Sequence, residues 1–235
     1  MLWSWLNYTA LQETLQRSLT LPAPQPAIIT ALDLGTASGY LTSMKTPVIL
    51  ASNSPRRKEL LQQVGIPFVA DPADVDESVR PGELPAVYAV RVALDKGRVA
   101  AKRAGKGIVL AADTIVLVDG SILGKPSGAD EAVSILKRLS GREHEVITGV
   151  AIIEAASGKE LARHETTRVR FRRLKEQEIK AYVATGEPLD KAGAYGIQGK
   201  GALLVERIDG CYFNVVGLPL SMVENMLYDF GISVW

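Results

Sequence analysis

Short apolar segments alternate with helical patterns after residue 44, and this order is the feature that most limits the possible folds. Two hairpins are predicted as well, 114–123 around Asp119-Gly120 and 203–216 around Asp209-Gly210, because Asp-Gly is typical of two-residue turns. Strands alternating with helices, with two hairpins added, indicate an α/β fold in which helices flank a mixed, twisted sheet. The predicted strands are 48–50, 108–112, 145–154 and 161–171, and the predicted helices are 55–64, 84–103, 129–139, 174–185 and 219–229.

The first 44 residues differ in composition from the rest of the chain. They contain three charged residues, whereas the remaining 191 contain 50. Alternating prolines between positions 22 and 26 exclude a regular helix there, and the lack of basic residues before Arg17 argues against a signal peptide. We predict that 1–44 is an N-terminal extension, dispensable or poorly ordered and upstream of a second start at Met44, and that 45–235 is the functional domain.

Composition excludes several classes of protein. Hydrophobic residues make up 47% of the chain and charged residues 23%, as in globular proteins, whereas a disordered chain has few apolar residues and a large net charge. No apolar run approaches the ~18 residues that indicate a membrane span. The net charge of +1 provides no general field for nucleic acid. We therefore expect neither a membrane nor a nucleic-acid partner, and any anion site must be built locally.

The chain has one cysteine, Cys211, and two histidines, His144 and His164. A single cysteine excludes an intrachain disulfide and favours a reducing, cytoplasmic location. No histidine lies near Cys211 in the sequence, so we interpret it as a small strand residue rather than a nucleophile. The scarcity of both residue types argues against a structural zinc site, but carboxylates can still hold a hard divalent cation.

The segment between the first strand and the first helix carries a candidate anion site. Ser54 suits the N-cap and Pro55 the first helical position, which puts Arg56 and Arg57 in the first turn. Positive charge there opposes the helix dipole at a cost of ~0.3–1 kcal/mol for each residue. Free backbone N–H groups and two guanidinium groups would make an anion cradle. A solvated pair of arginines is the alternative.

Two further candidates come from the centre of the chain. Asp113 ends the predicted strand 108–112, and ligand sites in open α/β sheets gather at such strand ends, although a lone aspartate is also a common turn residue. Lys96 shares a helical stripe with small residues, among them Ala89 and Ala93. Small neighbours would let Lys96 reach a pocket; the alternative is a lysine that extends to solvent at the edge of the core.

Further charged residues lie in predicted loops. Paired carboxylates such as Asp76-Glu77 suit a divalent ion, with a solvated loop as the alternative, and Lys125 after the first hairpin is placed to contact phosphate. Together the candidates supply two arginines, two lysines and three carboxylates beside short loops. A triphosphate with its metal needs that mixture, because cations spread the charge while carboxylates hold the ion and activate water.

A glycine-rich segment runs from Gly193 to Gly201, with four glycines in nine residues that permit close backbone approach. Its spacing is not that of a P-loop. Gln198 within it offers one donor and one acceptor, which matches the edge of uracil or thymine. A tight turn with an exposed Gln198 is the alternative.

These motifs together resemble the Maf family of nucleoside triphosphate pyrophosphatases. The likeness runs from about residue 47 to residue 230 and leaves residues 1–44 unmatched. It is specific, because several separated motifs agree in the family's order. The motifs are Ser52-Asn53-Ser54-Pro55-Arg56-Arg57, Ala112-Asp113-Thr114, Gly124-Lys125-Pro126, the segment 189–199, and Val216-Gly217-Leu218-Pro219.

The resemblance implies a Maf/ITPase-like fold and a hydrolase that cuts a nucleoside triphosphate between its α and β phosphates, with a divalent cation, Mg²⁺ or Mn²⁺, as cofactor. The form Tyr195-Gly196-Ile197-Gln198 resembles the branch that acts on dTTP and UTP. Modified pyrimidine nucleotides would fit the same edge. A homodimer is also implied.

The resemblance further implies roles for single residues. The family's general base falls on Asp113, and Glu77 with Asp113 would position the metal; whether Asp113 is base or metal ligand stays open. Specificity is implied for Arg56, Thr114 and Gln198. The full set of implied substrate-binding residues is Ser52, Arg56, Arg57, Lys96, Thr114, Lys125 and Gln198.

Two other functions stand as alternatives. A nucleotide-binding regulator of cell division with little catalysis would have the same cation-rich site but no need for a base at Asp113. A phosphohydrolase would release orthophosphate in place of pyrophosphate.

Overall fold

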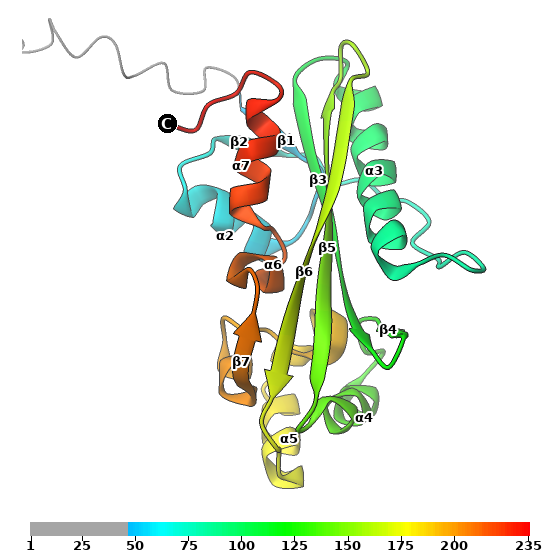
Figure 1. The fold of residues 1–235 in the computed structure, drawn as a ribbon, viewed down its shortest axis with the longest axis vertical. Helices are drawn as coiled ribbons and strands as arrows, with labels where there is room; N and C mark the ends of the chain where they lie inside the picture. Colours follow the sequence, from blue (N-terminus) through cyan, green and yellow to red (C-terminus); the bar gives the residue numbers. More distant parts are fainter. Residues whose placement is uncertain (1–46) are drawn as a thin grey trace, which may run out of the picture. The chain divides into compact units, whose positions relative to one another are not determined.

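A mixed sheet of seven strands forms the centre of residues 47–235, the part of the chain that the computed structural model describes (Figure 1). The predictions for residues 1–44 lie outside the described residues. The strand order is β2-β1-β3-β5-β6-β7, with β4 paired to β3, and β2, β1 and β3 are parallel while the other pairs are antiparallel. The strands are β1 (Val48–Leu50), β2 (Phe68–Ala70), β3 (Ile108–Val118), β4 (Ser121–Leu123), β5 (Glu143–Glu154), β6 (Glu160–Phe171) and β7 (Val205–Asp209).

Helices cover both faces of this sheet. The α-helices are α2 (Pro55–Gln63), α3 (Pro85–Ala104), α4 (Ala129–Leu139), α5 (Glu176–Val183), α6 (Tyr212–Val216) and α7 (Leu220–Tyr228), and three 3₁₀ helices are η1 (Glu187–Asp190), η2 (Ala192–Ala194) and η3 (Lys200–Leu204). Helix α3 lies on one face of the sheet, and α2, α6 and α7 lie on the other (Figure 1). Within the described residues, no helix is both long and apolar enough to cross a membrane.

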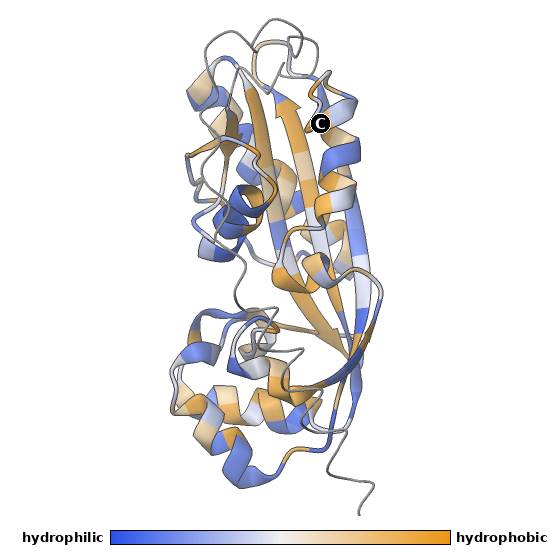
Figure 2. Ribbon diagram, turned by 90° about the vertical axis from the view of Figure 1, so that its left-hand side faces the viewer, coloured by the Kyte–Doolittle hydropathy of each residue, from blue (hydrophilic) through white to orange (hydrophobic). Residues whose placement is uncertain are grey.

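Separate hydrophobic clusters hold these layers. One joins α2, α6 and α7 to β1, β3 and β5, and another joins α4 and α5 to the far ends of β3, β5 and β6. The central strands of the sheet are largely hydrophobic, whereas an outer strand and the outer turns of the helices are more hydrophilic (Figure 2). Gly149 of β5 lets α3 approach closely, because a Cβ atom there would lie 2.3 Å from the carbonyl oxygen of Ala89.

Most predicted elements are confirmed within a few residues. The hairpin at Asp119-Gly120 is also confirmed, with both residues at positive φ as a type I′ turn requires. The second predicted hairpin is wrong. Strand β7 pairs with β6, and residues 212–216 form helix α6. Cys211 is therefore not a strand residue, since it lies at the N-cap of α6. The short edge strand β2 was not predicted.

Asp113 does not end its strand. Strand β3 continues to Val118 because β5 pairs with it from Ile108 to Leu117, with Asp113 opposite Gly149. The strand that ends beside Asp113 is β1, whose last residue pairs with Leu110. Further along the same edge of β3, β4 pairs with it only from Val116 onward, so a gap separates β1 from β4. Positions 111–115 thus form an open stretch of strand edge, from which the neighbouring residues Asp113 and Thr114 both line the same cleft.

Candidate active site

A cleft of about 530 Å³ lies along this open edge of β3. Its walls come from the β1–α2 connection, the segment 72–77, α3, β3, the turn after β4 and the segment 190–198. The structure brings every predicted site residue to this one cleft. They are Ser52, Arg56, Arg57, Glu77, Lys96, Asp113, Thr114, Lys125 and Gln198.

Arg57 is a buried cation held by neutral groups. Its Nε donates to the carbonyl oxygen of Gly217 at 2.8 Å, and its Nη1 and Nη2 donate to the hydroxyls of Ser52 and Thr114, both at 3.0 Å. Burial lowers the pKa of Arg57 from its ordinary value, while the negative charge of Asp113 opposes that shift. A buried cation without a direct carboxylate partner is costly, and a bound anion in the cleft would offset this cost.

Arg56 extends along the cleft wall, with its Nη1 3.8 Å from Oδ2 of Asp190. Ser54 occupies the predicted N-cap and Pro55 the first helical position, but the Ser54 side chain makes no capping hydrogen bond. The first turn of α2 therefore has no carboxylate or side-chain cap in front of its N–H groups. The dipole and the two arginines favour an anion at this helix end, as predicted.

Lys96 joins the two acidic candidates. Its Nζ lies 2.8 Å from Oδ1 of Asp113 and 2.7 Å from Oε1 of Glu77. Asp113 is buried, with 8% of its surface exposed, whereas about half of the Glu77 side chain is exposed. The single positive charge of this ammonium group offsets part of the negative charge of the two carboxylates. The arrangement gives a buried carboxylate that is oriented toward the cleft and available to bind or deprotonate a water molecule.

The donor set at this point fits a magnesium or manganese ion. Glu77 and Asp113 supply carboxylate oxygens, which hard divalent cations prefer. Within residues 47–235 there is no group of three or more His, Cys, Asp or Glu side chains placed to hold a metal ion. In proteins, Mg²⁺ is usually bound by one or two carboxylates together with phosphate oxygens of the substrate. Glu77 and Asp113 therefore fit a metal that arrives together with a polyphosphate.

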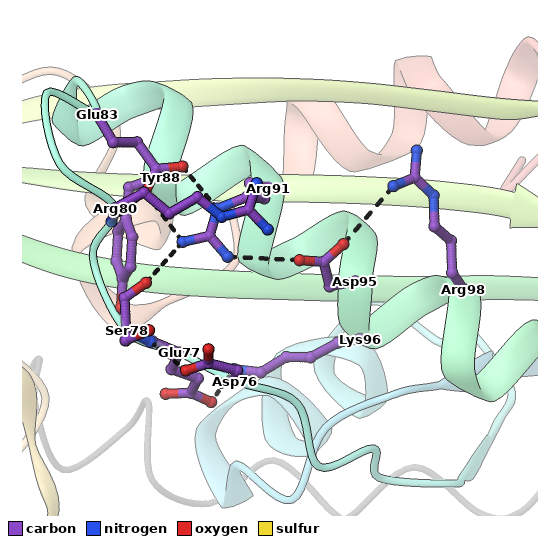
Figure 3. Close-up of polar contacts among 10 residues, drawn as sticks. All are labelled: Asp76, Glu77, Ser78, Arg80, Glu83, Tyr88, Arg91, Asp95, Lys96 and Arg98. Atoms are coloured by element: carbon purple, nitrogen blue, oxygen red, sulfur yellow. Dashed lines mark hydrogen bonds and ion pairs between the residues drawn. The ribbon is translucent and has the colours of Figure 1, made fainter.

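The loop that carries Glu77 is fastened to α3 by side chains that sequence reasoning missed (Figure 3). The hydroxyl of Tyr88 donates to the carbonyl oxygen of Glu77 at 2.7 Å. Arg91 donates to Glu83 at 2.6 and 2.9 Å and to the carbonyl oxygen of Ser78 at 2.9 Å. The hydrogen bond from Arg91 lowers the pKa of Glu83 to about 2. The position of Glu77 therefore depends on hydrogen bonds that Tyr88 and Arg91 make with the backbone and side chains of this loop.

Gln198 and Lys125 lie on the exposed rim of the cleft. The segment that carries Gln198 is held by Glu187, which accepts hydrogen bonds from the N–H groups of Lys200 and Gly201 at 2.9 and 3.1 Å. A Cβ at position 199 would lie 2.5 Å from the Glu187 carboxylate, so any side chain there would displace this carboxylate. The glycines of this segment indicated in the sequence that another part of the chain packs closely against it. No local pattern identified Glu187 as that residue.

Below this segment, Tyr195 lines the cleft and its hydroxyl lies 2.8 Å from Nε2 of His144. His144 packs edge-on against Tyr195 and Phe171. Burial lowers the pKa of His144 to about 4, so the ring is neutral at pH 7. Its Nδ1 has no hydrogen-bond partner within the described part of the chain. We assign His144 a positioning role under the glycine-rich segment.

An α/β sheet whose cleft is lined by five Lys and Arg side chains and four Asp and Glu side chains is typical of proteins that bind phosphorylated ligands. The sequence pattern of the Maf-like protein family matches residues 47–230, and the chain belongs to this family.

Curated relatives agree with that assignment. A dTTP/UTP pyrophosphatase from Moorella thermoacetica is 53% identical over 188 residues, which cover 80% of this chain and 97% of the relative. Proteins of the same name from Syntrophomonas wolfei and Symbiobacterium thermophilum are 51% and 53% identical, covering 79% and 80% of this chain and 98% and 96% of theirs. Among solved structures, a HAM1 protein from Coxiella burnetii matches 78% of this chain and 98% of its own, with a TM-score of 0.47 and 17% identity.

Proposed function

We propose that the protein hydrolyses dTTP and UTP to the nucleoside monophosphate and pyrophosphate. The observation that carries the proposal is the convergence of all predicted site residues on one cleft, in a chain about half identical to relatives named dTTP/UTP pyrophosphatase. Modified pyrimidine nucleotides with the same base edge belong to the proposed substrate class.

The cations bind the triphosphate. Arg56 and Arg57 at the start of α2, Lys96 on α3 and Lys125 on the opposite rim approach the cleft from different elements. Spreading the triphosphate charge over several fixed cations stabilises both the bound substrate and the charge that develops on the leaving pyrophosphate. Because Arg57 is buried and rigidly hydrogen-bonded, its geometry is set before the substrate binds.

Asp113 acts on the attacking water. Its carboxylate is buried and fixed by Lys96 at 2.8 Å, which orients one oxygen and leaves the other for a water molecule. The water attacks a phosphorus, the bond to the bridging oxygen between the α and β phosphates breaks, and pyrophosphate leaves with the electron pair. A water proton passes to Asp113 when it acts as the base. The alternative role for Asp113, ligand of the metal, uses the same carboxylate.

Glu77 and Asp113 are the residues that would hold a divalent cation, Mg²⁺ or Mn²⁺. Bound there, the ion would neutralise phosphate charge and polarise a phosphoryl oxygen. Lys96, which lies between the two carboxylates, would then be available to contact the phosphates.

Gln198 and Thr114 read the pyrimidine base. An amide offers one donor and one acceptor, which match a uracil or thymine edge when neighbouring dipoles fix the orientation of the amide. A cytosine edge has the reversed order, and a buried polar group left unpaired by the wrong base lowers kcat/KM strongly. Tyr195 is held by His144 on one side of Gln198 and Lys200 by Glu187 on the other, which supports a defined backbone position for Gln198.

A panel of triphosphates with products resolved, run with and without Mg²⁺, tests the proposal. We expect monophosphate and pyrophosphate from dTTP and UTP in the presence of Mg²⁺. Orthophosphate as the product would indicate a phosphohydrolase. Nucleotide binding without turnover would favour the regulator of cell division, and a preference for purines would contradict the base reading while leaving the reaction intact.

We also propose a reducing, cytoplasmic location, which the single cysteine supports. The homodimer, the lack of a nucleic-acid partner and the dispensable extension 1–44 stay predictions.

A further inference from the structure

A buried row of hydroxyl groups leads away from the cleft behind Thr114. Thr114 of β3 is paired in register with Thr148 of β5, and their Oγ1 atoms lie 3.0 Å apart. Thr148 Oγ1 lies 3.2 Å from the carbonyl oxygen of Asn214. Thr148 has no exposed surface, and it is not among the residues that line the cleft. Thr114, its hydrogen-bonded neighbour, connects it to the cleft.

The direction of each hydrogen bond in this row is fixed by its ends. A carbonyl oxygen only accepts, so Thr148 must donate its single proton to Asn214. Thr148 must then accept from Thr114, whose own proton is used in that bond. At the other end, the Nη2 group of Arg57 only donates, so Thr114 accepts from it. Toward the cleft, Thr114 has no proton left and offers only a lone pair.

A Thr114 hydroxyl that can only accept toward the cleft favours ligand groups that donate a hydrogen bond. It attracts an N–H or O–H group and repels a phosphate oxygen or an unprotonated ring nitrogen. Uracil and thymine carry a proton on N3, whereas cytosine has a lone pair there. We propose that Thr148 is a positioning residue for pyrimidine specificity, which orients the Thr114 hydroxyl so that it accepts from N3–H. This inference rests on the proposed function, and it identifies the residue that orients Thr114 for recognition of the base.

The test is Thr148→Val, which keeps the shape of the side chain and removes the acceptor. The Thr114 proton is then free to turn toward the cleft and to donate to N3 of cytosine. We expect the ratio of kcat/KM for dTTP to that for dCTP to fall about 10-fold, a change of about 1.4 kcal/mol. Thr148→Ser retains the hydroxyl and should retain the ratio.

Thr167→Val is the matched control. Thr167 is an equally buried threonine on the neighbouring strand β6, and its hydroxyl also donates to a carbonyl oxygen, that of Cys211. It has no hydrogen bond to Thr114 or Thr148. Its Oγ1 accepts from Nδ2 of Asn214, which also donates to the carbonyl oxygen of Val146, so the loss of this hydroxyl should reduce stability while Asn214 stays held and the ratio is unchanged. If Thr148→Val fails to fold, Thr148→Cys, with a weak acceptor, should lower the ratio in the same direction.

Equal losses for dTTP and dCTP in the Thr148 variants would overturn the inference, because they would mean that Thr114 contacts a group common to both nucleotides, such as a sugar hydroxyl, or that Thr148 is only structural. The proposed function fails separately. A wild-type protein that does not prefer dTTP to dCTP, or does not release pyrophosphate, would contradict the proposed function before any variant is measured.

Discussion

The ammonium group of Lys96 lies 2.8 Å from the carboxylate of Asp113, although the two residues belong to different elements, α3 and β3. Both side chains are largely buried. Removing one member of such a pair leaves a charge that is poorly solvated. Lys96 also contacts Glu77 at 2.7 Å, so a change at any of the three residues is expected to affect the other two.

The first prediction concerns Asp113→Asn, which keeps the size of the side chain and removes its charge. We expect kcat for dTTP to fall about 10²–10⁴-fold, the usual contribution of a positioned base, while nucleotide binding is retained because the cations are unchanged. Steady-state kinetics and equilibrium binding of dTTP measure the two effects. Near-normal turnover would exclude both the base and the metal-ligand role.

Lys96→Met should also lower kcat, because it removes a phosphate contact and leaves two carboxylates without their shared cation. Lys102→Met is its control, since Lys102 is an exposed lysine on the same helix and should leave activity unchanged. Equal effects of the two substitutions would mean that the position of Lys96 between Glu77 and Asp113 is irrelevant to the reaction.

A second prediction concerns metal binding. Because the described residues contain no group of three metal ligands, and Lys96 lies between the two candidate carboxylates, Mg²⁺ should bind weakly to the protein alone and more tightly with a non-hydrolysable triphosphate analogue. Isothermal titration calorimetry measures this difference. Glu77→Gln should weaken the metal affinity of the complex, whereas Asp76→Asn, at an exposed neighbour, should not. Tight binding without nucleotide would contradict the prediction.

The sequence allowed the fold class to be predicted because hydrophobic periodicity is a local signal. The position of Asp113 was predicted by incorrect reasoning. A carboxylate after an apolar run suggests a strand end. However, β3 continues because it pairs with β5, and the contact with Lys96 compensates the buried charge of Asp113. Strand pairing is a long-range property, so the gap between β1 and β4 that opens the site was not visible in the sequence.

Local sequence signals predicted the cationic residues of the site better than the residues that hold its loops in place. Arg56 and Arg57 oppose a helix dipole, and that unfavourable placement is visible from sequence. Glu187 and Arg91 are ordinary surface residues in the sequence, and their roles depend on which loop folds back on them. The second hairpin was predicted wrongly because the apolar residues 212–216 also suit a short buried helix.

A third prediction addresses the loop that carries Glu77. Arg91→Lys removes the bidentate contact with Glu83 and the bond to Ser78. We expect faster hydrogen–deuterium exchange in residues 73–84 and a several-fold lower kcat at limiting Mg²⁺. Because the pKa of Glu83 is lowered to about 2, the loop contact in the wild type should persist as the pH falls through 4.5.

The control for this loop is Arg98→Lys, at an arginine of the same helix whose carboxylate partner Glu160 lies outside the loop. It should leave exchange in residues 73–84 unchanged. Unaltered exchange in Arg91→Lys would show that the loop is held by other contacts, such as the bond from Tyr88 to Glu77.

A fourth prediction concerns stability against pH. Burial lowers the pKa of His144 to about 4 in the folded protein, whereas an unfolded histidine has a pKa of about 6.5. Between these values the unfolded state binds more protons, so the free energy of unfolding falls as the pH falls from 6.5 to 4. His144→Gln should remove about 3 kcal/mol of that loss, as measured by urea unfolding at pH 7 and pH 4. His164→Gln, at the exposed histidine of β6, should lose stability in parallel with the wild type, and the same parallel behaviour in His144→Gln would contradict the buried, neutral state of His144.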